Sequence, residues 1–152
     1  MIRCLEVSLA IPDNEARTAL ETLQRLGIAI QGLERADLYR CDVDEAAADG
    51  LVATFGALET VYNPNKHVLR VRESSRPEPG EVWIDEIDAA PKLAAGEFVR
   101  MAGRTLAGVR ALERFTAWRL TGSAGAPAAG DVVAAASETL LCNAAFQKAE
   151  RG

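Results

Sequence analysis

The sequence contains one histidine, His67, which could act as a general acid or base or as a metal ligand. It lies in the stretch Asn63-Pro64-Asn65-Lys66-His67. A catalytic histidine needs a nucleophile and an orienting carboxylate, and no serine or cysteine of this sequence stands in a recognisable nucleophile motif. The pattern therefore favours a turn residue before a strand, and an enzyme that uses Arg35, His67 and Asp42 is the alternative.

The three cysteines, Cys4, Cys41 and Cys142, are widely spaced. A zinc site needs three or four Cys or His ligands at characteristic short spacings, so these residues and one histidine predict no metal site. The sequence also has no phosphate-binding Gly-x-x-x-x-Gly-Lys-Ser/Thr stretch, and we expect no bound cofactor. An odd number of scattered cysteines is typical of reduced thiols in a cytoplasm.

Asp42 and Asp44 stand on alternate positions at the end of an expected strand, so their side chains should share one face. Two such carboxylates could share a proton or a cation. The interpretation that we favour is a solvated strand end, followed by a helix that Asp44 caps.

A motif of charged and aromatic residues occurs twice, with the same internal spacing in each half of the chain. Leu33-Glu34-Arg35 is followed after a short gap by Tyr39-Arg40, and Leu112-Glu113-Arg114 is followed after the same gap by Trp118-Arg119. Flanking residues keep this offset between the halves to within one position, as Asn63 and Asn143 do. The sequence thus predicts an internal duplication.

The four arginines of the motif could present bidentate donors to a carboxylate or phosphate ligand. Ion pairs within the chain or at an interface are the interpretation that we favour. Tyr39 and Trp118 are expected to pack sheets against helices in a core that has few aromatic residues.

The stretch 73–80 contains two prolines, two serines and a glycine, which is typical of an exposed linker. It divides the chain into expected repeats at 1–72 and 81–152. Each repeat is predicted to run strand, helix, strand, helix, strand. In the first, Asp13 or Asn14 should cap a helix that Gly27 ends, Asp44 should cap the next helix, and the last strand covers 68–72.

The second repeat is predicted from weaker patterns. We expect a strand at 82–87, a helix from about Leu93 to Leu106, a strand at 112–120, a loop at 122–130 and a helix capped by Asp131. The last segment, around 144–147, is short and polar beside its counterpart in the first repeat. Its strand is therefore expected to be eroded.

Composition limits the classes of protein that remain. The chain has 152 residues, a formal charge of −5, 49% apolar and 26% charged residues, which is typical of a globular protein. Binding to a phosphate backbone needs clustered Lys and Arg, so a nucleic-acid partner is not expected. No apolar run is long enough to cross a membrane, and the first residues carry charges unlike those of a signal peptide. We expect a cytoplasmic protein.

The segments 7–20 and 26–43 resemble the small PurS-type subunit of phosphoribosylformylglycinamidine synthase. That family has a first strand, a turn into a helix, a Leu-Gly helix end, a second strand and an Asn-Pro pair before the last strand. Val61-Tyr62-Asn63-Pro64 stands where the Asn-Pro belongs, and Asn143 stands at the equivalent point of the second copy. The turn glycine is replaced by Asn14, and Asp37-Leu38 replaces a Gly-Lys pair.

The resemblance implies an α+β fold of two PurS-like, ferredoxin-like repeats with antiparallel sheets, packed as a pseudo-twofold pair. It also implies a non-catalytic role in purine biosynthesis, because the family's subunit links a glutaminase to an ATP-dependent synthetase for ammonia transfer. The family's subunits pair as dimers, so a homo-oligomer is compatible with it. Candidate interface residues, taken from motif position, are Arg35, Tyr39, Arg40, Asn63, Pro64, His67, Arg114, Trp118 and Arg119.

A small-molecule-sensing module with ferredoxin-like topology is the alternative function. Such sensors bind amino acids or other effectors between two copies of the unit. They usually have a glycine-rich turn after the first strand, where this sequence has Pro12-Asp13-Asn14.

Overall fold

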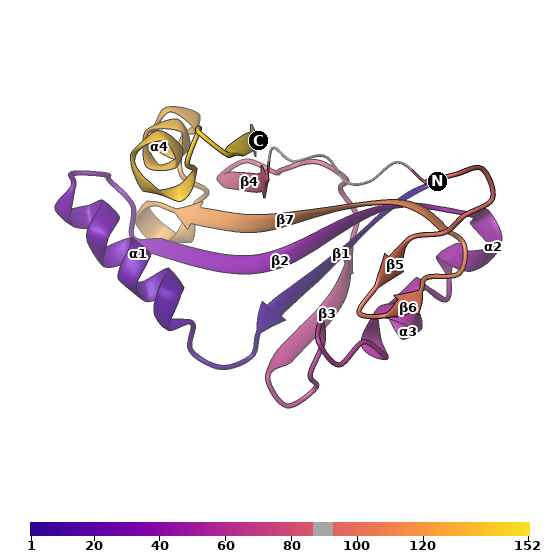
Figure 1. Cartoon of the computed structure of the whole chain (residues 1–152). Helices are drawn as coiled ribbons and strands as arrows, with labels where there is room; N and C mark the ends of the chain where they lie inside the picture. The colour runs from indigo at the N-terminus through magenta and orange to yellow at the C-terminus, as the bar shows by residue number, and fades with distance from the viewer. Residues whose placement is uncertain (87–92) are drawn as a thin grey trace. The chain divides into compact units, whose positions relative to one another are not determined.

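A computed structural model of the chain describes residues 1–86 and 93–152, without the side chain of Glu86. The fold is α+β, with a mostly antiparallel six-stranded sheet of order β3-β1-β2-β7-β4-β8 and a few helices (Figure 1). The sheet strands are β1 (Ile2–Leu9), β2 (Gly32–Val43), β3 (His67–Arg72), β4 (Glu81–Glu86), β7 (Val109–Thr121) and β8 (Gln147–Arg151). The remaining elements are α1 (Asn14–Arg25), α2 (Glu45–Ala48), α3 (Leu51–Gly56), the short strands β5 (Arg100–Met101) and β6 (Arg104–Thr105), the 3₁₀ turn η1 (Ser123–Gly125), α4 (Gly130–Ala136) and the π-helical turn η2 (Ser137–Leu141).

The chain forms two compact units, each assembled from three separate segments. Unit 1 comprises Met1–Ile11, Asp37–Ser75 and Ala89–Arg114, and unit 2 comprises Pro12–Ala36, Arg76–Asp88 and Phe115–Gly152. Each unit therefore draws on both halves of the sequence. The boundaries of the repeats, at 1–72 and 81–152, stay a prediction.

Unit 1 has its core between β1, β3, the second part of β2 and helix α3. Strands β1 and β3 pair antiparallel with Leu5 opposite Val71. The period-2 pattern of the sequence predicts the first of these strands. The helix expected after Asp44 is divided at Asp49–Gly50 into α2 and α3. The buried apolar cluster consists of Leu5, Val7, Tyr39, Cys41, Val43, Leu51, Phe55, Leu58, Leu106 and Val109.

Unit 2 has its core between β4, the second part of β7 and the helical segments α1, α4 and η2. Asp13 caps α1, because its carboxylate accepts hydrogen bonds from the N–H groups of Glu15 and Ala16 at 3.1 Å. Gly27 follows the helix with a φ of +84°, as expected of a helix-ending glycine. The buried apolar cluster consists of Leu23, Ile30, Leu33, Val82, Ile84, Leu120, Ala128, Val133, Ala136 and Leu141.

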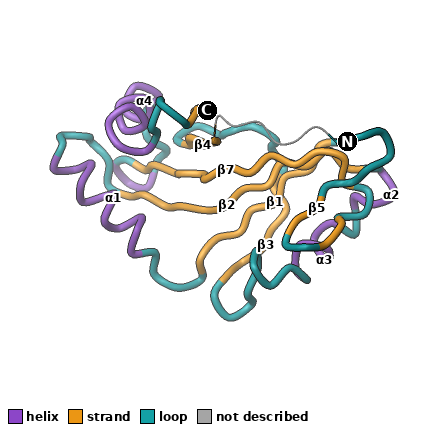
Figure 2. The backbone as a smooth tube through the Cα atoms, viewed as in Figure 1, coloured by secondary structure: helices purple, strands orange, loops and turns teal. Residues whose placement is uncertain are grey.

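The predicted helix from Leu93 to Leu106 is wrong. Residues 93–99 form a loop and turn that lead into a small hairpin of β5 and β6 (Figure 2). Ala102 and Gly103, which connect these strands, have φ values of +52° and +75°. Two positive φ values are what a tight two-residue hairpin turn requires, and they are incompatible with a right-handed helix.

Two predicted helix caps are also wrong. Asp44 stands at the N-cap of α2, but its side chain makes no capping hydrogen bond. The N-cap of α4 is Ala129, and Asp131 lies inside the first turn. The last strand, expected to be eroded, is present as β8, and the end of the predicted strand 82–87, Ile87, lies outside the described residues. No helix among the described residues is both long and apolar enough to cross a membrane.

Candidate functional site

The turn from Asn63 to His67 in unit 1 is held by side chains as well as by the backbone. The N–H of Asn63 donates to His67 Nδ1 at 2.9 Å, and Asn63 Oδ1 accepts from the N–H of Asn65 at 2.9 Å. The carbonyl of Asn63 accepts from the N–H groups of Lys66 and His67 at 2.9 and 2.8 Å. Because Nδ1 accepts, the proton of the neutral imidazole lies on Nε2. His67 thus closes this turn and is the first residue of β3, in agreement with the turn role that the sequence favours, and Pro64 lies within the same turn.

Unit 2 contains the same turn, before β8. The N–H of Asn143 donates to Gln147 Oε1 at 2.9 Å, and Asn143 Oδ1 accepts from the N–H of Ala145 at 3.1 Å. The carbonyl of Asn143 accepts from Phe146 and Gln147 at 3.1 and 2.8 Å. The amide oxygen of Gln147 therefore replaces the imidazole nitrogen of the first turn. The two turns stand at the positions that the repeated motif makes equivalent in the sequence.

Two motif arginines make ion pairs within unit 2. Arg35 forms a bidentate pair with Asp13, at 3.0 and 3.1 Å, and lies 5.8 Å from the centre of the Trp118 ring. Arg119 contacts Glu81 Oε1 through Nη2 at 2.9 Å and Glu34 through Nη1 at 3.4 Å. Bidentate and stacked geometry of this kind is characteristic of arginine.

The other two motif arginines make ion pairs within unit 1. Arg40 donates to Glu113 at 2.7 Å and to the carbonyl of Ser75 at 3.2 Å. Arg114 lies 3.4 Å from Asp37. The ion-pair interpretation of the four arginines is confirmed, while their role as interface residues stays a prediction.

The two aromatic residues of the motif differ in their burial. Tyr39 is 3% exposed and packs against Phe55 with ring centres 5.2 Å apart. This burial raises the pKa of the Tyr39 hydroxyl. Trp118 is partly buried against the unit 2 cluster. Core packing is therefore confirmed for Tyr39. Trp118 packs against the unit 2 cluster and also lies beside the guanidinium of Arg35.

Asp42 and Asp44 do not share a proton or a cation. Asp42 accepts from the amino group of Met1 at 3.2 Å, and Asp44 forms a bidentate pair with Arg110 at 2.6 and 3.3 Å. The hydrogen bond and charge of Asp44 raise the pKa of Arg110. Because this carboxylate is engaged by a guanidinium, it does not cap the helix that follows.

Two buried carboxylates escaped the sequence analysis. Glu6 is 4% exposed and accepts from Arg70 Nη2 at 2.5 Å and Arg72 Nη1 at 2.8 Å. Glu81 is 2% exposed and accepts from Trp83 Nε1 at 3.2 Å as well as from Arg119. An alternating strand predicts that polar residues face solvent, so only the Arg-x-Arg pattern of 70–72 could have indicated the clamp on Glu6.

The cysteines are free thiols, and two of them are buried in unit 1. Burial raises the pKa of Cys41 to about 12, with a smaller contribution from Cys4. The thiolate is the reactive form of cysteine, so Cys41 is inert at neutral pH.

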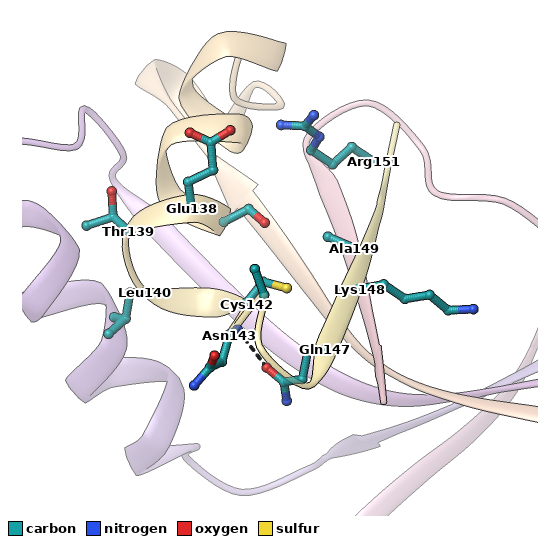
Figure 3. Close-up of a pocket in the computed structure, with 11 residues that line it drawn as sticks. Glu138, Thr139, Leu140, Cys142, Asn143, Gln147, Lys148, Ala149 and Arg151 are labelled. Carbon is teal, nitrogen blue, oxygen red and sulfur yellow. Dashed lines mark hydrogen bonds between the residues drawn. The ribbon is translucent and has the colours of Figure 1, made fainter. Parts of the chain in front are cut away.

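An open pocket of about 640 Å³ lies in unit 2 between η2 and β8 (Figure 3). Figure 3 shows Ala149 facing the pocket and Lys148 pointing away from it. In unit 1, the position equivalent to Ala149 holds Leu69, which packs against the core cluster. The side chain at this position is therefore smaller in unit 2 than in unit 1. The pocket is lined by Ser137, Glu138, Thr139, Leu140, Cys142, Asn143, Ala144, Gln147, Lys148, Ala149 and Arg151.

No group of three or more His, Cys, Asp or Glu side chains in the described part of the chain could hold a metal ion. Among the described residues, the candidate surfaces for binding another molecule are the two asparagine turns, the edge strand that follows each turn, and the pocket beside η2. No protein-family model matches the chain, and a comparison with curated proteins gives no significant match.

Proposed function

We propose that the protein is a non-catalytic bridging subunit that binds other chains through its two asparagine turns and the exposed edge of strand β3. The observation that carries this proposal is the equivalent hydrogen bonding of the turns at Asn63 and Asn143, in which His67 Nδ1 and Gln147 Oε1 are the matching acceptors. A module with two equivalent binding features is suited to joining two partners. Duplication of one ferredoxin-like, PurS-like unit, as 1–72 and 81–152, is part of the proposal.

Strand β3 offers an exposed edge after the first turn. The N–H of Ala10 donates to the carbonyl of Lys66, so Lys66 directs its main-chain groups toward β1. Alternate residues of an antiparallel strand repeat this direction, so Val68 and Arg70 also direct their N–H and C=O groups toward β1. Those of Leu69 and Val71 point away from β1, where a partner strand could bind them. Val68 and Val71 are 48% and 51% exposed. This edge supports a docking role better than a catalytic one.

The resemblance of the sequence to PurS-type subunits supplies the identity of the proposed partners. These are the glutaminase and the ATP-dependent synthetase of phosphoribosylformylglycinamidine synthase, a glutamine-dependent carbon–nitrogen ligase of purine biosynthesis. The protein would assist ammonia transfer between them in the cytoplasm and would need no cofactor of its own.

Reconstitution tests this proposal. The protein is mixed with the glutaminase and synthetase of the same source, glutamine and ADP, and the mixture is separated by size-exclusion chromatography. We expect the three chains to co-elute and the glutamine-dependent activity to fall when this chain is omitted. Replacing Val71 by Glu should weaken co-elution, while the matched change Val52→Glu on α3 should not. Separate elution with undiminished glutamine-dependent turnover would refute the proposal.

The pocket beside η2 favours a second candidate function, the sensing of a small molecule. A ligand that binds only the folded protein at about 100 times its Kd adds about 2.7 kcal/mol of stability. For a chain of this length, that corresponds to a rise in Tm of about 5–10 °C. A thermal-shift screen of amino acids and nucleotides should find such a rise, and Ala149→Leu should abolish it by filling the pocket. The absence of any shift, with the bridging assay positive, would dismiss this candidate.

A further inference from the structure

Strand β8 has an open edge whose main-chain groups are assigned by its register. The N–H of Gly152 donates to the carbonyl of Glu81 of β4 at 3.2 Å. Glu150 and Lys148 are separated from Gly152 by two and four positions in the pairing with β4, so they direct their main-chain groups toward β4 as well. In an antiparallel pair, alternate residues direct their N–H and C=O groups to the neighbouring strand. Ala149 and Arg151 therefore turn these groups away from β4. Because β8 is the last strand in the order of the sheet, no further strand of the described chain covers them.

The charges on this edge strand are self-complementary. Lys148 and Glu150 lie on one face and flank Ala149 on either side. A second β8, antiparallel and centred on Ala149, sets Lys148 of each copy opposite Glu150 of the other. These positions form the non-hydrogen-bonded pairs of the new ladder, where Cα atoms approach to about 4.5 Å. We propose that a second copy of this chain docks here, by antiparallel β8–β8 pairing about Ala149.

The same charges select the register. A shift of the pairing by two positions in either direction sets Lys148 opposite Lys148 or Glu150 opposite Glu150. Like charges directly opposite each other destabilise a sheet, whereas opposite charges stabilise it. Of these three registers, only the one centred on Ala149 forms two Lys148–Glu150 pairs, one from the lysine of each copy.

The other edge strand, β3, does not offer this complementarity. Its residues at the positions equivalent to Lys148 and Glu150 are Val68 and Arg70. Pairing of β3 with β3 thus gains no opposite-charge pair, and pairing of β3 with β8 centred on Leu69 and Ala149 sets Arg70 opposite Lys148. A shift by two positions that sets Arg70 opposite Glu150 sets Arg72 opposite Lys148. Head-to-tail pairing of unlike edges would propagate into a filament. The charges disfavour it and leave the closed, twofold β8–β8 dimer.

Strand β8 carries both the pocket beside η2, whose lining includes Lys148, and the residues of the proposed charged pairs. Lys148 points away from the pocket, where it also lies 3.6 Å from Asp85 of β4 (Figure 3). Its distance from Asp85 and its 59% exposure leave it accessible to a second carboxylate.

Two charge reversals test the inference without reference to any partner enzyme. In Lys148→Glu or in Glu150→Lys, both pairs between positions 148 and 150 of the dimer become like-charge pairs. We expect each variant alone to dissociate at least about tenfold more readily than the wild type in sedimentation equilibrium, since two favourable pairs become unfavourable. A mixture of the two variants restores every opposite-charge pair, so we expect a heterodimer of near wild-type affinity, detected with one variant tagged.

The mixture also controls for misfolding, because an unfolded variant cannot be rescued by another. Val71→Glu places a new charge on the edge of β3 and should leave the dimer intact. A wild type that stays monomeric at every attainable concentration would overturn the inference. So would reversals that leave the dimer unchanged, a mixture that stays monomeric, or dissociation by Val71→Glu alone.

Discussion

The buried clamp of Glu6 between two arginines provides a quantitative test of what stabilises unit 1. The side chains of Glu6 and Arg72 are each 5% exposed, whereas that of Arg70 is 51% exposed. Replacing Glu6 by Gln breaks a buried ion pair with Arg72 by removing one of its two charges, which costs about 3–5 kcal/mol. For a chain of this length, each kcal/mol lowers Tm by about 2–4 °C. We therefore expect thermal and urea unfolding to show a loss of Tm of at least about 6 °C.

Two further variants separate the charge effect from packing. Arg70→Met should cost less than about 1 kcal/mol, because the half-exposed guanidinium gains little from its ion pair. The double variant Glu6→Leu/Arg72→Met removes both buried charges, and replacing a buried ion pair by apolar residues of similar volume is often neutral. It should therefore unfold within a few degrees of the wild type. If Glu6→Gln unfolds at the wild-type temperature, or if the double variant is the least stable, the clamp does not act as a buried ion pair.

Three more predictions concern single positions. Because the pKa of Cys41 is raised, the folded chain keeps a thiol proton that the unfolded chain releases above about pH 9. The contribution of this thiol to the free energy of unfolding is therefore fully present below about pH 9 and is lost as the pH rises toward 12. In urea titrations at pH 7 and 10, the wild type should lose about 1 kcal/mol more than Cys41→Ala, and equal losses would contradict the raised pKa. His67→Gln should leave Tm nearly unchanged, because the second turn already uses a glutamine oxygen, while His67→Ala should lose about 1 kcal/mol with its hydrogen bond; equal melting of the two variants would show that the acceptor is dispensable. Gly108→Ala should destabilise more than Gly96→Ala in thermal melts, since both have positive φ but only at Gly108 would the added methyl meet the side chain of Ala47. Equal costs would mean that backbone strain alone matters.

The elements of the first half could be predicted because their local signals agree with their surroundings. Strand alternation at 5–9, the cap at Asp13 and the glycine at 27 each point to the observed element. The segment 93–106 misleads because its apolar spacing is helical, whereas its glycines take positive φ and support turns. In this segment the spacing of apolar side chains favours a helix, whereas the positive φ values of the glycines favour turns. The structure observed is the one that the backbone conformation favours.

The candidate site was predictable only in part. The offset of Asn63 and Asn143 indicated two equivalent turns, because the residue type that closes a turn is visible in the sequence. The pocket was not predictable, since its lining combines residues of η2 and β8, and no sequence pattern shows the space between two elements. The clamp on Glu6 was hidden for a related reason, because strand alternation carries no information about what covers the polar face.

The segmented composition of the two units has a consequence for synthesis on the ribosome. Unit 1 needs the chain up to Arg114, and its core includes Leu106 and Val109. Unit 2 takes its first segment from Pro12–Ala36 and ends at Gly152. When only the segment 1–72 has emerged, the core of unit 1 therefore lacks Leu106 and Val109, and helix α1 of unit 2 must wait for strands made much later. Both units should gain protease resistance only late in translation, and a fragment that ends at Arg72 should remain unfolded.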